Sequence, residues 1–327
     1  MIVILDSYTA NPGDISWDSA VKDLPLAEGE LKIYPRTAPE DVVARCQGAD
    51  IVLTNKVIIS REVIKALPAL RYVGVLATGY NVVDLAAARE HGIIVTNIPA
   101  YSTMSVAQMV FAHILNIANG VGAHANAVRE GAWQNSADFM FTVTPQQELA
   151  SLTLGIVGLG NTGLATARIA LAFGMRLAIF TSKSAGEVES LLGSKDFIVT
   201  KNVDDVFRVA DYLSLHCPLT DTTRHLVNAE RLKLMKSSAV IINTGRGPLV
   251  DEAALAEALA NGTIRAAAAD VLTQEPPRDG SPLIPLSNCH LTPHIAWASK
   301  AARERLLTVA FDNIRAYLAG NPQNVVS

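Results

Sequence analysis

The sequence predicts an α/β protein that contains two doubly wound parallel sheets. Strand-like and helix-like segments alternate over residues 1–100 and again over residues 151–293, and the connections between them are short. The second series opens on a glycine-rich turn between a strand and a helix, and a length of 327 residues is typical of about two domains. These observations favour two units, each with its own buried core.

The first series consists of short apolar runs that alternate with amphipathic segments. Ser60 is the expected N-cap of one helix, and Gly92 ends another. A glycine-containing turn at 77–81 follows a strand, which is where open α/β sheets bind ligands. Its backbone N–H groups either hold a substrate carboxylate or form an ordinary turn. The expected strands are 1–6, 49–54, 71–76 and 93–96, with helices at 60–67 and 84–90.

The glycine-rich turn spans residues 152–163 and reads L-T-L-G-I-V-G-L-G-N-T-G. Gly158 permits a tight turn, Gly160 lets the backbone approach a pyrophosphate, and Gly163 allows close packing of helix on strand. The helix that follows presents free N–H groups to an anion at its first residues, Asn161 and Thr162. The motif therefore predicts a dinucleotide site, with a purely structural turn as the alternative.

The next strand, over 175–180, ends where NAD-binding proteins carry an acidic residue for the ribose 2′-hydroxyl. This chain instead has Thr181, Ser182 and Lys183 there. No carboxylate at this point repels a 2′-phosphate, and a lysine with two hydroxyls can bind one. NADP(H) is therefore favoured over NAD(H). In the alternative interpretation Lys183 is a solvated loop charge and the site discriminates poorly.

Polar residues follow several strands of the second series at their carboxyl ends. They occur at 216–220, at 244–247 and at Asp270, and parallel strands bring such ends to one crevice. Cys217 is most simply a small buried residue, although a reactive thiol is the alternative. The remaining elements are helices at 203–210, 228–235 and 251–260 and strands at 212–216, 239–243 and 264–270.

Three residues of this series are candidates for the chemistry. Arg246 directly follows an apolar strand, so its guanidinium needs an anion, either a substrate carboxylate or a structural ion pair. His294 follows a short strand, and Glu275 lies shortly before it. A carboxylate beside a histidine fixes the ring and favours its charged form, which suits general acid–base work. A surface glutamate with a capping histidine is the alternative.

Between the two series lies a helix over 106–118 that is apolar nearly all round, which predicts burial between domains or subunits. His113 within it is expected to be a packed core histidine. A more polar segment with Arg129, Trp133 and Pro145 follows. We expect it to form a second helix and an extended arm that crosses to the other unit or to a partner subunit.

Composition narrows the function classes. The net charge of −4 without a basic stripe argues against a nucleic-acid surface, and no apolar run reaches the length of a membrane span. The N-terminus is strand-like and does not resemble a basic signal segment. Three scattered cysteines, Cys46, Cys217 and Cys289, indicate neither a disulfide framework nor a metal site. We expect a cytoplasmic protein that acts on a small molecule.

Several motifs in a fixed order resemble the D-isomer-specific 2-hydroxyacid dehydrogenase family. They are G-L-G-N-T-G, S-L-H-C-P-L-T, I-I-N-T-G-R-G-P-L-V-D, D-V-L-x-x-E-P and T-P-H, and the resemblance as a whole runs from about residue 70 to residue 300. V-L-A-T-G-Y-N, A-Y-S-T-M-S-V-A and T-P-H-I-A-W are most similar to the hydroxypyruvate reductase (glycerate dehydrogenase) and glyoxylate reductase branch.

The resemblance implies reduction of hydroxypyruvate or glyoxylate to D-glycerate or glycolate by hydride transfer from a nicotinamide cofactor. It implies that Arg246 binds the substrate, that His294 donates a proton, and that Glu275 keeps His294 protonated. The implied substrate contacts are Leu76, Ala77, Thr78, Gly79, Arg246 and Trp297, with Tyr101 and Met104 shaping the pocket. The implied cofactor contacts are Gly158, Gly160, Asn161, Thr162, Gly163, Thr181, Ser182, Lys183, Cys217, Pro218, Thr222, Thr244, Gly245, Arg246, Asp270 and His294.

The resemblance also implies connectivity. A Rossmann cofactor domain at 101–294 is inserted into a flavodoxin-like substrate domain made of 1–100 and 295–327, with the active site in the cleft between them and a homodimer as the assembly. Two positions depart from the family pattern: Gln108, where glutamate is common, and Thr181, where NAD-dependent members have an acid. A nucleotide-sensing corepressor or scaffold on the same fold is the alternative function, and formate oxidation is disfavoured because Glu275 stands beside the histidine.

Overall fold

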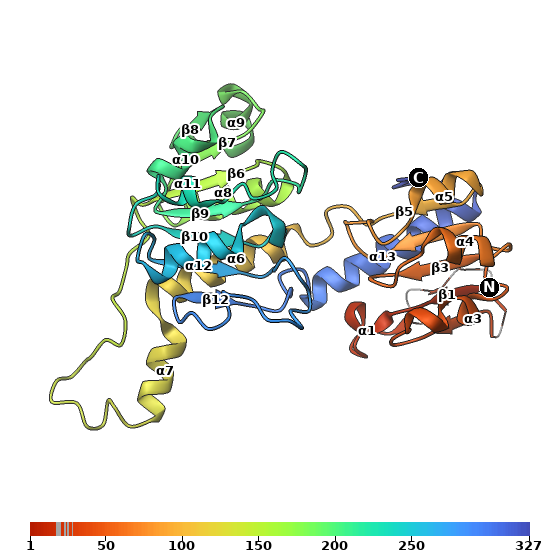
Figure 1. The fold of residues 1–327 in the computed structure, drawn as a ribbon, viewed down its shortest axis with the longest axis horizontal. Coiled ribbons are helices and arrows are strands. Elements are labelled where there is room, and N and C mark those ends of the chain that lie inside the picture. The colour runs from red at the N-terminus through yellow and green to blue at the C-terminus, as the bar shows by residue number, and fades with distance from the viewer. Residues whose placement is uncertain (18–20, 23, 25, 28) are drawn as a thin grey trace. The chain divides into compact units, whose positions relative to one another are not determined.

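The computed structural model describes residues 1–17, 21–22, 24, 26–27 and 29–327 (Figure 1). The chain forms two compact units: unit 1 is Met1–Ser102 with Trp297–Ser327, and unit 2 is Thr103–Ala296. Each unit is built on its own parallel sheet, of five strands in unit 1 and seven in unit 2. The predicted fold class, α/β with two parallel sheets, is confirmed.

Unit 1 has the strand order β2-β1-β3-β4-β5. Its inner strands β1, β3 and β4 are buried on both faces because successive side chains enter different cores. Val3 and Leu5 pack with the helices α3 to α5, whereas Ile2 and Ile4 pack with α13. The elements are β1 (Ile2–Ile4), α1 (Ser7–Ala10), β2 (Leu31–Ile33), η1 (Pro39–Asp41), α3 (Val42–Cys46), β3 (Ile51–Thr54), α4 (Arg61–Ala66), β4 (Tyr72–Val75), α5 (Leu85–Glu90), β5 (Ile94–Thr96) and α13 (Lys300–Leu318).

Unit 2 has the strand order β12-β11-β10-β9-β6-β7-β8, so the chain reverses its direction of travel across the sheet at β6. All seven strands are parallel, and their carboxyl ends therefore share one edge. The elements are α6 (Thr103–Asn119), α7 (Val121–Arg129), β6 (Thr153–Val157), α8 (Asn161–Ala172), β7 (Arg176–Phe180), α9 (Ala185–Leu192), β8 (Phe197–Thr200), α10 (Val203–Val209), β9 (Tyr212–Leu215), α11 (Ala229–Leu232), β10 (Val240–Asn243), η2 (Gly247–Leu249), α12 (Glu252–Ala260), β11 (Ala266–Ala269) and β12 (Cys289–Leu291).

The sequence predictions omit the edge strands β2 and β8, whereas the short strands at the other two edges, β5 and β12, were expected. β8 lies at one edge of the unit 2 sheet, and its Ile198 is exposed, so neither alternation nor a continuous buried run marks it. The helix predicted at 228–235 is confined to α11, because a turn rather than helix follows Leu232. The central strands, which are buried on both faces, agree with the predictions to within two residues.

The long helix α6 packs its buried face against α8 and β10 of unit 2. His113 is buried in it as predicted, with Nε2 lying 3.2 Å from Thr292 Oγ1, and burial lowers its pKa. Beyond α6, Figure 1 shows α7 and the following loop extending away from the rest of unit 2. Trp133 and Phe139 are exposed there. The expected contact of this arm with another unit or subunit stays a prediction.

Within the described part of the chain, no single helix is both long and apolar enough to cross a membrane. The pair α6 and α7, bent by 55° at their junction, meets that length and composition criterion only when the two are taken together.

Candidate active site

The glycine turn sits between β6 and α8 at the shared carboxyl edge of the unit 2 sheet. Gly158 has a φ of +96°, and a Cβ added there would lie 2.8 Å from the Cys217 nitrogen. A Cβ on Gly163 would lie 2.2 Å from the Gly158 oxygen, so both positions exclude a side chain. By contrast, no atom lies within 4 Å of a Cβ built on Gly160. Gly160 therefore leaves open space at the start of α8.

The start of α8 fits an anionic group of a cofactor. No side chain caps the helix at Gly160, so its first amides keep their hydrogen-bonding capacity and the positive end of the helix dipole faces the open space. At the carboxyl end of β10, Thr244 Oγ1 is buried and has no hydrogen-bond partner among the described residues. An orphaned buried hydroxyl is the kind of group that a ligand satisfies.

Beside the glycine turn lies the loop that contains Cys217, Pro218 and Thr222. Thr223 holds it by donating a hydrogen bond from Oγ1 to the Pro218 oxygen at 2.7 Å. Burial raises the pKa of the Cys217 thiol, which keeps it protonated and argues against the reactive-thiol alternative.

After β7, Thr181 is buried and Ser182 is exposed. The backbone N–H of Lys183 donates to Thr181 Oγ1 at 3.3 Å, and Ser184 then caps α9. Glu187 completes a capping box with Ser184, whose backbone N–H and hydroxyl hold the pKa of Glu187 below its ordinary value. The nearest following carboxylate is therefore engaged by the helix cap, a role that the sequence reasoning did not anticipate.

Arg246 lies in a turn that the buried side chain of Asn243 organises. Asn243 Oδ1 accepts a hydrogen bond from the Gly245 N–H at 3.1 Å, and its Nδ2 donates to the Arg246 oxygen at 2.9 Å. The exposed guanidinium donates only to the Gly245 oxygen, at 2.8 Å, and pairs with no carboxylate of the described residues. The structure therefore does not support the alternative in which Arg246 forms a structural ion pair, and the guanidinium is available to an anion.

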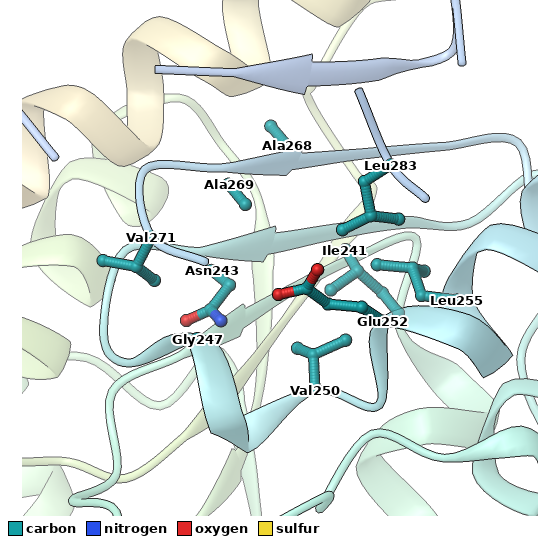
Figure 2. Close-up of a pocket in the computed structure, with 10 residues that line it drawn as sticks. All are labelled: Ile241, Asn243, Gly247, Val250, Glu252, Leu255, Ala268, Ala269, Val271 and Leu283. Carbon is teal, nitrogen blue, oxygen red and sulfur yellow. The ribbon is translucent and has the colours of Figure 1, made fainter. Parts of the chain in front are cut away.

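The Arg246 turn packs directly on the loop that leads to Glu275. A Cβ on Gly247 would lie 2.0 Å from the Leu272 carbonyl carbon, so the two backbones touch. Glu252 also holds this loop in place, because its carboxylate accepts hydrogen bonds from the Thr273 N–H and the Ser281 hydroxyl, both at 2.6 Å. The Glu252 carboxylate points into a small cavity (Figure 2). The cavity has a volume of about 10 Å³, and Ile241 and Asn243 of β10 and Ala268 and Ala269 of β11 are among the residues that line it.

His294 and Glu275 form a close pair. His294 Nδ1 lies 2.5 Å from Glu275 Oε2, and the other carboxylate oxygen accepts a hydrogen bond from the Leu272 N–H at 2.9 Å. The two side chains are 29% and 34% exposed, so the far ring nitrogen of His294 can reach a ligand. The sequence suggested this His294–Glu275 pair only as a candidate, and the structure contains it. The arrangement suits proton transfer.

Asp270 holds the turn that carries His294. Its carboxylate is 1% exposed and accepts hydrogen bonds from the Thr292 hydroxyl at 2.6 Å, the Ile295 N–H at 2.9 Å and the Ala296 N–H at 2.7 Å. This helps to fix His294 in a left-handed conformation with φ of +55°, which is unusual outside glycine. The contact of Asp270 with the cofactor stays a prediction.

In unit 1, the loop at 76–79 has the carbonyl groups of 76–78 occupied, whereas among its amides only that of Leu76 donates to a described residue, the Thr54 oxygen at 2.7 Å. The oxygens of Leu76, Ala77 and Thr78 accept hydrogen bonds at 3.0, 3.0 and 2.7 Å, from Asn55 Nδ2, the Ile98 N–H and Asn97 Nδ2 respectively. Among the described residues, the backbone N–H groups of 77–79 donate to no partner. Nearby in the same unit, the Tyr101 and Trp297 rings meet edge to face at 6.2 Å.

The sequence reasoning missed several residues that position these groups. Most of them act through a contact distant in sequence and carry no motif signal, whereas Asn243 acts within its own turn. Gly247 and Asp251-Glu252 flank the Arg246 motif, so a second glycine there was a usable hint. The missed residues are Asn55, Asn97, Asn243, Gly247 and Glu252.

Gly247→Ala is expected to lower kcat/KM strongly while leaving the protein folded. The new methyl group must displace the Leu272 backbone, which separates Arg246 from Glu275, and overpacking of this kind costs about 1–3 kcal/mol. Gly186→Ala is the matched control, because a Cβ there meets nothing within 4 Å. Thermal unfolding and steady-state kinetics check both variants. Full activity in Gly247→Ala would show that the close approach is dispensable.

Comparisons with known proteins identify the family of this chain. Residues 111–296 match the sequence profile described as "D-isomer specific 2-hydroxyacid dehydrogenase, NAD binding domain". A hydroxypyruvate reductase of Blautia hydrogenotrophica is 42% identical over 329 residues, which cover 100% of this chain and 99% of that relative. A glycerate dehydrogenase of Methylorubrum extorquens is 41% identical over 314 residues, covering 95% of this chain and 96% of that relative.

Among solved structures, a protein of Thermus thermophilus superposes with a TM-score of 0.85 at 33% identity, and the match covers 100% of both chains. The sequence profile covers more than half of the chain, and the relatives match along nearly their whole length. The chain therefore belongs to the D-isomer specific 2-hydroxyacid dehydrogenase family.

Proposed function

We propose that this enzyme reduces a small 2-oxo acid, hydroxypyruvate or glyoxylate, to the D-2-hydroxy acid, D-glycerate or glycolate. The observation that carries the proposal is the accessible His294–Glu275 pair at the same sheet edge as Arg246. The two relatives, a hydroxypyruvate reductase and a glycerate dehydrogenase, support the substrate class. A bound nicotinamide cofactor supplies the hydride.

In this proposal the protein residues bind the negatively charged oxygens of the substrate and donate one proton. Arg246 binds the substrate carboxylate and carbonyl oxygen with its planar fork of donors. His294 donates a proton to that oxygen as it gains negative charge, and Glu275 stabilises the charged imidazole through Nδ1. Glu252 and Asp270 act through the backbone, since each holds a loop that carries one member of the pair.

We assign substrate binding to the part of the chain at 1–100 and 295–327, and cofactor binding to 101–294. The division into two compact units supports these boundaries. The free amides at 77–79 suit a substrate carboxylate, because their neighbouring carbonyl oxygens are bonded elsewhere. Tyr101 and Trp297 are aromatic neighbours that suit a small side-chain pocket.

For the cofactor we propose a preference for NADP(H), with NAD(H) as the weaker ligand. The support is the acid-free end of β7, where Thr181, Ser182 and Lys183 stand and where Glu187 is engaged by the α9 cap. Lys183→Ala is expected to weaken NADPH about tenfold, the loss of one charge-assisted contact, while NADH changes little. NADH in the same variant is the internal control. Equal losses for both cofactors would remove the argument.

The substrate and cofactor proposals are tested together by measuring kcat/KM for NADPH and NADH against several 2-oxo acids. We expect turnover with hydroxypyruvate or glyoxylate and higher values with NADPH. A pocket that differs by one methylene discriminates by only about 1–3 kcal/mol, so the matrix must include slightly larger 2-oxo acids. If no small 2-oxo acid is turned over, the corepressor or scaffold alternative is favoured.

A further inference from the structure

Lys201 follows β8, at the carboxyl edge of the sheet, and β8 is hydrogen-bonded to β7. Its ammonium group donates to the carbonyl oxygens of three consecutive residues: Thr181 at 2.9 Å, Ser182 at 2.8 Å and Lys183 at 2.8 Å. An ammonium group has three N–H donors, and here all three bind the loop at 181–183. The loop after β7 therefore curves around Lys201 Nζ.

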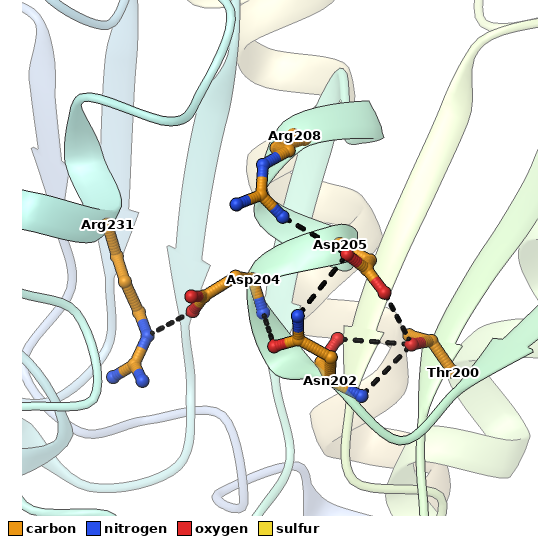
Figure 3. A network of polar contacts seen from close by, with 6 residues as sticks. All are labelled: Thr200, Asn202, Asp204, Asp205, Arg208 and Arg231. Carbon is orange, nitrogen blue, oxygen red and sulfur yellow. Dashed lines mark hydrogen bonds and ion pairs between the residues drawn. The ribbon is translucent and has the colours of Figure 1, made fainter.

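The backbone on either side of Lys201 is itself held in place. The Thr200 hydroxyl lies 2.8 Å from Asp205 Oδ2, and it accepts a hydrogen bond from the Asn202 N–H at 3.0 Å. Figure 3 shows how arginines extend this network on both sides. Its members are Thr200, Asn202, Asp204, Asp205, Arg208 and Arg231. Since both neighbours of Lys201 are anchored, its side chain starts from a defined position.

Lys201 binds hydrogen-bond acceptors of the loop after β7 and leaves donors of that loop unoccupied. Carbonyl oxygens carry partial negative charge and repel a phosphate, and here three of them face a cation. Within the described part of the chain, the Ser182 hydroxyl and the Lys183 ammonium are engaged by no hydrogen bond or ion pair of their own. The loop thus keeps its free donors available while its acceptors are satisfied by Lys201.

We propose that Lys201 is a specificity-determining residue that tunes this loop for the 2′-phosphate of an adenosine ribose. It does so by positioning Ser182 and Lys183 and by adding a second positive charge beside them, without itself having to touch the phosphate. The inference rests on the proposed preference for NADP(H) and extends it to a residue on a different strand from the binding loop.

The test compares Lys201→Met with Lys195→Met. Lys195 precedes β8 at the opposite sheet edge, is strongly exposed, and pairs at the surface with Glu189 at 3.4 Å, so its removal controls for net charge. Calorimetric titration measures the binding of adenosine 2′,5′-bisphosphate and of adenosine 5′-monophosphate to each full-length variant. Steady-state kinetics measure kcat and KM with NADPH and NADH.

We expect Lys201→Met to weaken the bisphosphate about tenfold and to raise KM for NADPH similarly, as for one charge-assisted contact. The monophosphate, KM for NADH and kcat should change little. Lys201→Arg, which keeps the charge and offers several donors, should retain most of the preference. Thermal unfolding confirms that the variants are folded.

Equal weakening of the two adenosine ligands by Lys201→Met would overturn the proposal, since it would show a purely structural role. So would a matching loss in Lys195→Met, because the effect would then be one of net charge alone. If the wild type turns over no 2-oxo acid, the substrate proposal fails while the ligand titrations still test Lys201. If the wild type does not favour the bisphosphate, both the cofactor preference and the role of Lys201 fail.

Discussion

His294→Ala is expected to lower kcat for hydroxypyruvate or glyoxylate by about 10²–10⁴-fold, the usual contribution of a positioned general acid. The imidazole is the titratable group that Glu275 orients, and alanine leaves the substrate oxygen without a proton donor. Cofactor binding should be largely retained, because the glycine turn and the loop after β7 are untouched. Stopped-flow or steady-state rates, together with fluorescence titration of NADPH, measure the two properties separately.

His290→Ala is the matched control for that experiment. His290 lies in β12, four residues before His294, and its half-buried ring lies 3.4 Å from Asn116 Nδ2. Its removal should leave kcat near the wild-type value. A His294→Ala protein that keeps wild-type turnover would show that another group donates the proton.

Arg246→Ala is expected to lower kcat/KM for the 2-oxo acid on the order of 10²–10³-fold, because truncating one partner of a hydrogen-bonded charge pair costs about 2–5 kcal/mol. Arg246→Lys should recover only part of the loss, since an ammonium lacks the planar fork that matches a carboxylate. The free energy of unfolding should hardly change, because among the described residues the exposed guanidinium bonds only to the Gly245 oxygen.

The control for Arg246 is Arg176→Ala, which removes an exposed arginine from the amino end of β7, at the opposite edge of the sheet. It should have wild-type kinetics. An unchanged KM for the 2-oxo acid in Arg246→Ala would argue that the substrate carboxylate binds elsewhere, with the amides at 77–79 as the next group to examine.

Much of this protein follows from local sequence. Buried strands bounded by turns predict the two parallel sheets, because both faces of such strands must be covered. The spacing of Gly158 and Gly163 between a strand and a helix predicts the dinucleotide turn, and in the structure both positions admit no Cβ. Parallel strands also place Arg246 and Asp270 at one edge, since Asp270 directly follows β11 and Arg246 lies in the turn that follows β10.

The tertiary structure decided how the side chains at that edge are used. Spacing cannot show that Glu275 meets His294, that Asp270 binds the turn around His294, or that Lys201 closes on the loop after β7. Each of these contacts joins segments that are 18 to 26 residues apart. Loop conformation depends on such long-range hydrogen bonds and close approaches, for which the local sequence carries no periodic signal.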